Sequence, residues 1–110
     1  MSALEGVTVV EFGDGVAVGF CGVLLAACGA RVIKVEAPGR GDIVRHLPPF
    51  GDGVAAPEAS GLHAFLSVGK ASITIDLGQE QGQDLARRLA AGADVGEVRA
   101  RAASLQESNP

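Results

Sequence analysis

The stretch that decides the fold is Val7-Thr8-Val9-Val10-Glu11-Phe12, followed by Gly13-Asp14-Gly15 and by an apolar run from Val16 to Cys28, which Gly29 ends. The first segment is β-branched and apolar, as in a buried parallel strand, and the glycines allow the positive φ of a tight turn. The apolar run predicts a buried helix of at least three turns, with Gly29 as its C′ residue. Arg31-Val32-Ile33-Lys34-Val35-Glu36 predicts a second strand, which a helical crossover makes parallel to the first.

Three further elements are expected downstream of a long loop. Residues 60–68 predict a brief helix that Ser60 caps and that turns three apolar side chains inward, namely Leu62, Phe65 and Leu66. Residues 71–77 alternate polar and apolar with a β-branched centre, which predicts a third strand. Residues 79–91 predict a helix whose apolar stripe contains Leu85 and Leu89.

These elements indicate an α/β protein with a Rossmann-like parallel sheet and flanking helices. Ala93-Asp94-Val95 resembles the start of a fourth strand that is never completed, and residues 97–106 predict a charged surface helix. We therefore expect a domain over residues 1–95 and a surface helix with a tail over residues 96–110. A strand that stops at Val95 leaves an open sheet edge, so the domain is expected to be truncated.

Composition narrows the classes of partner. The chain has 110 residues, a formal net charge of −4 and nine basic residues, which are scattered rather than clustered, so neither nucleic acid nor an acidic membrane surface is an expected partner. The longest apolar run contains Gly19 and Gly22 and is too short to span a bilayer. The first residues lack the basic region and cleavage site of a secretory signal, so a cytoplasmic location is expected.

The cysteines and histidines do not predict a metal site. Cys21 and Cys28 lie seven residues apart on the apolar helix, without the spacing of zinc ligands, and are expected to be buried thiols. His46 and His63 are isolated in sequence from carboxylates and cysteines, so each is assigned a structural or solvent-facing role.

The glycine turn permits one functional hypothesis from the residues alone. Ligands of parallel sheets bind at the carboxyl ends of the strands, and Gly13, Gly15 and Gly19 approximate a dinucleotide-binding fingerprint. Glu36 ends the next strand, where an acidic side chain would accept a ribose hydroxyl. The third glycine stands one position later than in the standard pattern. A noncatalytic NAD-type nucleotide-binding or interaction module is therefore one alternative.

A second hypothesis comes from four stretches in order along the chain, residues 4–12, 24–42, 65–77 and 85–95. The second contains Gly29-Ala30-Arg31-Val32-Ile33-Lys34-Val35-Glu36-Ala37-Pro38-Gly39-Arg40-Gly41-Asp42. Together they resemble the N-terminal portion of the class III CoA-transferases, the family of formyl-CoA transferase, carnitine CoA-transferase and α-methylacyl-CoA racemase. The resemblance implies CoA transfer between carboxylic acids, with coenzyme A or an acyl-CoA as ligand, no metal, and a homodimer in the full-length family.

The resemblance also implies where CoA would lie, along the carboxyl edge of the sheet. The implied binding residues follow the three strands, and they are Val16, Ala17, Ala37, Arg40, Ile75, Asp76, Leu77 and Gly78. Two of them depart from the family pattern, since an arginine is often found at position 37 and a lysine is common at position 78. Arg40 is the cation in the same loop as Ala37.

The resemblance assigns no catalytic residue to this chain. The resemblance places the family's catalytic aspartate beyond position 110. The aspartates present, at positions 14, 42, 52, 76, 84 and 94, do not match it. The expected protein is the CoA-binding N-terminal portion of a transferase, inactive alone, with the α-methylacyl-CoA racemase branch as an alternative within the family.

Overall fold

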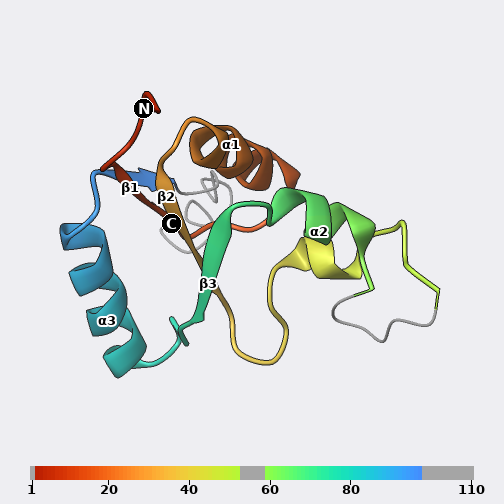
Figure 1. Cartoon of the computed structure of the whole chain (residues 1–110). Coiled ribbons are helices and arrows are strands. Elements are labelled where there is room, and N and C mark those ends of the chain that lie inside the picture. The colour runs from red at the N-terminus through yellow and green to blue at the C-terminus, as the bar shows by residue number, and fades with distance from the viewer. Residues whose placement is uncertain (1, 53–58, 98–110) are drawn as a thin grey trace, which may run out of the picture.

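The computed structural model describes residues 2–52 and 59–97, which form a four-stranded sheet flanked by helices (Figure 1). The strands are β1 (Thr8–Glu11), β2 (Arg31–Glu36), β3 (Lys70–Thr74) and β4 (Val95–Glu97). They lie in the order β3-β2-β1-β4, and each pairing is parallel. The expected α/β class, with a parallel sheet built on the first three strands, is confirmed.

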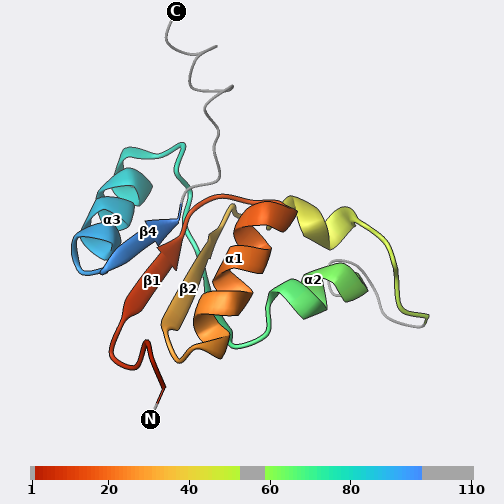
Figure 2. The same ribbon diagram turned by 90° about the horizontal axis from the view of Figure 1, so that it is seen from above.

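Helices cover both faces of this sheet. α1 (Val16–Ala27) and α2 (Gly61–Leu66) lie on one face, together with the short 3-10 helix η1 (Ile43–His46), and α3 (Glu80–Ala91) lies on the other (Figure 2). The Ser60 hydroxyl accepts a hydrogen bond from the His63 N–H and so caps α2 as expected. None of the helices in the described ranges has the length and apolar character needed to cross a membrane.

Successive residues of each strand point to opposite faces of the sheet, which divides the apolar core in two. Beneath α1, Val9 and Val32 pack with Leu25 and Ala26. Beneath α3, Val10 and Val35 pack with Ile75, which follows β3, with Leu89 of α3, and with Ala93, which follows α3. Each helix is therefore held to the sheet by a small cluster rather than by one large core.

The prediction of a fully buried first helix is wrong. Val16, Phe20 and Leu24 are each about half exposed, and the buried residues of α1 are Val18, Gly19 and Gly22. A single sheet covers only one side of a helix, so the apolar residues of the opposite side remain in solvent. The same geometry exposes four other residues expected inside, Phe65, Leu85, Cys21 and Cys28.

The prediction for the fourth strand also needs correction. β4 does form, and it pairs with β1 through Val9↔Val95, Val10↔Gly96 and Glu11↔Glu97. Glu97 is therefore a strand residue and not the first residue of a helix. The rest of the expected surface helix, residues 98–106, lies outside the described residues. β4 itself lies at one edge of the described sheet.

Candidate functional site

Charged side chains replace apolar ones at the carboxyl half of the α1-facing side of the sheet. Glu11, Lys34 and Glu36 are no more than 7% exposed, although each lies in a strand that is otherwise apolar. Three further residues complete what we call the buried charge cluster, and they are Asp42, Arg45 and Lys70. The six carry three positive and three negative formal charges. Such balance is what burial of charge requires.

Lys34 occupies the centre of the buried charge cluster. Its ammonium lies 2.9 Å from Glu11 Oε2, donates to the Gly13 carbonyl at 2.5 Å and forms an ion pair with Asp42 Oδ2. Burial disfavours the charged form, but the hydrogen bonds and charges of Asp42 and Glu11 outweigh it and raise the pKa of Lys34 above its ordinary value of 10.5. Lys34 is therefore a fixed cation at neutral pH, with three acceptors for its three protons.

Lys70 extends the cluster from β3 to α1. Its ammonium lies 2.8 Å from Glu11 Oε1 and donates to the Gly19 carbonyl at 2.9 Å. Gly22 leaves the room for this contact, because a Cβ there would overlap Glu11 Oε1 and approach Lys70 Nζ to 2.8 Å. The glycines inside α1 thus allow the helix to lie directly on an ion pair.

Glu36 is fully occupied by protein partners. Its carboxylate accepts from Arg45 Nε at 2.8 Å and Nη2 at 2.9 Å, from the Ser72 hydroxyl at 2.9 Å and from the Asp42 N–H at 2.8 Å. The hydrogen bonds from Arg45 are the main reason that the pKa of Glu36 falls to about 2. A carboxylate held in this way has no capacity left for a ribose hydroxyl. The geometry therefore disfavours the NAD-type hypothesis, which needs Glu36 free.

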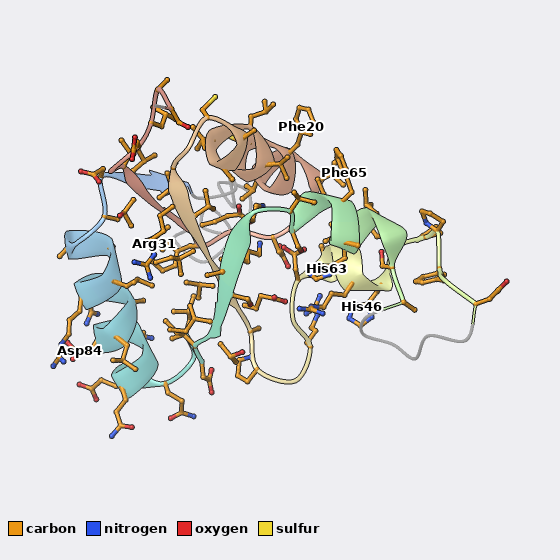
Figure 3. All side chains as sticks on the ribbon, in the orientation of Figure 1. Phe20, Arg31, His46, His63, Phe65 and Asp84 are labelled. Atoms are coloured by element: carbon orange, nitrogen blue, oxygen red, sulfur yellow. The ribbon has the colours of Figure 1, made fainter. Side chains whose placement is uncertain are left out.

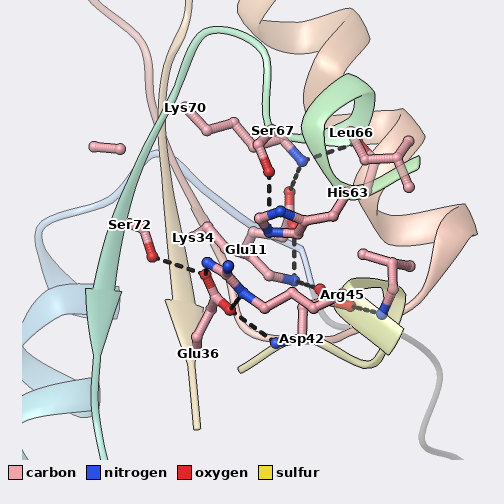
Figure 4. A pocket seen from close by; sticks show the side chains of 13 residues that line it. Glu11, Lys34, Glu36, Asp42, Arg45, His63, Leu66, Ser67, Lys70 and Ser72 are labelled. Atoms are coloured by element: carbon pink, nitrogen blue, oxygen red, sulfur yellow. Dashed lines mark hydrogen bonds and ion pairs between the residues drawn. The ribbon is translucent and has the colours of Figure 1, made fainter. Parts of the chain in front are cut away.

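A cavity of about 150 Å³ adjoins the buried charge cluster beneath α2 (Figure 4). His63 borders it, and His63 Nε2 lies 3.2 Å from the Ser67 hydroxyl, one helical turn away. Burial, followed by the positive charge of Arg45, lowers the pKa of His63. The imidazole is accordingly neutral at pH 7.

A second pocket, of about 210 Å³, lies at the carboxyl edge of the sheet, and we call it the edge pocket. Five of the eight sequence-predicted binding residues line it, namely Ala37, Ile75, Asp76, Leu77 and Gly78. Arg40 lies with Ala37 around an adjoining hollow, whereas Val16 and Ala17, at the start of α1, do not line the edge pocket. Four carboxylate residues contribute to its lining, and they are Asp14, Glu36, Asp42 and Asp76. Its walls include no basic residue among the described side chains.

Sequence reasoning did not identify the buried charge cluster. The signal was present, because Glu11, Lys34 and Glu36 interrupt strands that are otherwise apolar, and an ionised side chain in such a strand must have a partner. Their partners could not be assigned, since Asp42 and Arg45 come from the start of η1 and from η1 itself, and Lys70 comes from a distant strand. Of His, Cys, Asp and Glu in the described ranges, no group of three is arranged to hold a metal ion.

Comparisons with known proteins agree with this architecture. The chain is 40% identical to succinyl-CoA–D-citramalate CoA-transferase of Chloroflexus aurantiacus and 38% identical to α-methylacyl-CoA racemase of Homo sapiens, each over 84% of this chain. A crystal structure of a CAIB/BAIF family protein from Brucella suis superimposes with a TM-score of 0.76 over 96% of the chain, at 37% identity. The chain spans only 22%, 19% and 28% of these three proteins, respectively.

The match extends across the fold and not only across its best-known motifs. The sequence profile described as CoA-transferase family III matches residues 4–106, which include the four strands, the glycine turn and the loop that carries Asp42. On that match, the chain belongs to CoA-transferase family III.

Proposed function

We propose that this chain binds the nucleotide portion of coenzyme A or an acyl-CoA at the carboxyl edge of its sheet, as the N-terminal part of a family III CoA-transferase. The observation that carries the proposal is the edge pocket, where residues following β2 and β3 converge although they are about 40 positions apart in sequence. Binding in the crevice outside the carboxyl ends of parallel strands is the general rule for such sheets.

Charge constrains how the ligand would lie. The edge pocket is rich in carboxylates, which repel phosphates, so its apolar floor of Phe12, Val35 and Ile75 suits the adenine ring. The phosphates would lie toward exposed Arg40 and toward the first N–H groups of α1 at Val16 and Ala17. Because Ala37 and Gly78 lack the cations common in the family, affinity for CoA is expected to be low.

The reaction proposed for the whole family protein is CoA transfer between carboxylic acids, with the racemase branch as the alternative. The chain by itself is proposed to bind and not to catalyse, because none of its aspartates matches the family's catalytic aspartate. A noncatalytic nucleotide-binding or interaction module is the competing proposal from a different class. The occupied carboxylate of Glu36 argues against the NAD-type version of that module.

Calorimetric titration with CoA and with NAD tests the proposal. The sharpest variants are Ala37→Arg, which restores a cation at an exposed position of the edge pocket, and Ala37→Glu, which adds a further carboxylate there. Attraction or repulsion of the phosphates should tighten CoA binding about threefold to tenfold in the first and weaken it by a similar factor in the second.

Two results would contradict the proposal. One is equal CoA affinity for the two Ala37 variants, which would show that the phosphates do not lie near this loop. The other is detectable NAD binding by a protein that does not bind CoA, which would favour the competing module.

A further inference from the structure

Asp42 connects the buried charge cluster to both ends of the turn that precedes α1. Its Oδ1 accepts from the Gly15 N–H at 3.1 Å, and its Oδ2 pairs with Lys34, which donates to the Gly13 carbonyl. Asp42 is 3% exposed and lies 27 residues from Gly15 in sequence. One carboxylate therefore contacts the turn directly at one end and through a lysine at the other.

The turn depends on contacts of this kind for its shape. Gly15 has φ 108°, in the region that glycine populates readily, and as the N-cap residue of α1 it has no side chain with which to make a capping hydrogen bond. Without an external contact, a glycine with this freedom would sample several backbone conformations. The Asp42 carboxylate selects one of them, and in doing so sets where α1 begins.

We propose that Asp42 is a positioning residue for the ligand. Through Gly15 and Lys34 it fixes the turn of residues 13–15, and so places the first N–H groups of α1, at Val16 and Ala17, against the carboxyl edge of the sheet. This inference rests on the proposed function, because the group to be placed is the nucleotide portion of CoA. It adds to that function by assigning Asp42, which also lines the edge pocket, a role that acts through the turn.

Three variants of the full chain separate positioning from general loosening. Asp42→Ala removes both links to the turn. Asp42→Asn is close in shape and keeps an oxygen that accepts from the Gly15 N–H, but like Asp42→Ala it loses the charge that pairs with Lys34, so the difference between the two variants isolates the direct contact with Gly15. Ser72→Ala removes a hydrogen bond of the same buried charge cluster, from Ser72 to Glu36, that does not touch the turn.

The first readout is hydrogen exchange at the Gly15 amide, which NMR monitors with the Val10 amide of β1 as an internal reference. Exchange at Gly15 relative to Val10 should rise about fivefold to tenfold in Asp42→Ala, and should stay within about twofold of the parent in Asp42→Asn and Ser72→Ala. The second readout is CoA titration, in which Asp42→Ala should bind about tenfold more weakly and Asp42→Asn should recover most of the affinity.

The outcomes distinguish this inference from the proposed function. Unchanged Gly15 exchange in Asp42→Ala, or an equal rise in Ser72→Ala, overturns the positioning role. A rise confined to Asp42→Ala with undiminished CoA affinity also overturns it, since the turn would then be irrelevant to the ligand. If the parent chain binds no CoA but the exchange pattern is as expected, the proposed function fails while the control of the turn by Asp42 is supported.

Discussion

The Lys34 ammonium and the Glu11 carboxylate lie 2.9 Å apart at paired positions of β2 and β1, both within the buried layer between the sheet and α1. Asp42 and Lys70 join the pair from a loop and from β3. These charged side chains thus lie between the sheet and α1, where the hydrophobic pattern of the strands predicts an apolar core. Removing one member of such a group leaves its partners charged and short of one counter-charge.

Lys34→Met should therefore strongly destabilise the fold. Loss of the ammonium leaves two buried carboxylates without their shared cation, which costs about 3–5 kcal/mol in the free energy of unfolding, a large part of a small domain's stability. Urea denaturation measures the change. The matched control is Arg88→Met, which breaks the exposed Arg88–Asp84 pair and should cost less than about 1 kcal/mol. Equal costs for the two variants would contradict a structural role for the cluster.

Gly22→Ala should destabilise the packing of α1 on the sheet. The added Cβ overlaps Glu11 Oε1 and crowds the Lys70 ammonium, and displacing either group disturbs the buried ion pair between them. We expect a loss of about 1–3 kcal/mol despite the higher helix propensity of alanine. Gly92→Ala is the control, since its Cβ would meet nothing closer than 3.8 Å. Thermal unfolding of both variants checks the prediction, which fails if Gly22→Ala is the more stable of the two.

Stability should fall on acidification through a window that Glu36 sets. The hydrogen bonds from Arg45 lower the pKa of Glu36 from 4.5 to about 2, so its contribution is complete above about pH 4.5 and is lost as the pH falls toward 2. The contribution is roughly 3 kcal/mol. Arg45→Met should raise the pKa of Glu36 and shrink the contribution. Urea midpoints measured between pH 2 and pH 6 test this, and a parallel pH profile in the variant would argue against the Arg45–Glu36 pair as its source.

Self-association should occur through the exposed faces of α1 and α2. Phe20 and Phe65 stack with ring centroids 6.5 Å apart, yet each remains about half exposed, and they lie side by side at the surface (Figure 3). Exposed apolar groups of this kind favour contact with a second copy of the chain. Phe20→Ser should delay elution from a size-exclusion column at high concentration, whereas Phe50→Ser, at an exposed phenylalanine elsewhere, should not.

A sharp monomer peak for the parent chain would contradict that prediction. A cooperative unfolding transition above about 65 °C would add that the chain is stable with these faces in solvent, and would argue against the expectation of a truncated domain.

The strands and helices followed from local features of the sequence. β-branched runs placed β1 and β2, and glycines at positions 15 and 29, both with positive φ, bounded α1 as expected. The resemblance implied where a ligand would bind, and five of its eight residues line the edge pocket, whereas Arg40, Val16 and Ala17 do not. Burial was less predictable, because hydrophobic pattern alone does not tell how many sides of a helix are covered, as Phe20 and Leu24 illustrate.

What the sequence by itself determined is therefore the order and type of β1, α1, β2, α2, β3 and α3, the parallel connection of β1 to β2, and the family of the chain, since these depend on local periodicity, glycine conformation and motif order. Only the tertiary structure decided the partners of Lys34, the occupation of Glu36 and the contact of Asp42 with Gly15. Those contacts join residues that are 6 to 36 positions apart, and burial removes the water that would otherwise satisfy their charges. Their energies therefore arise only once the chain has folded around them.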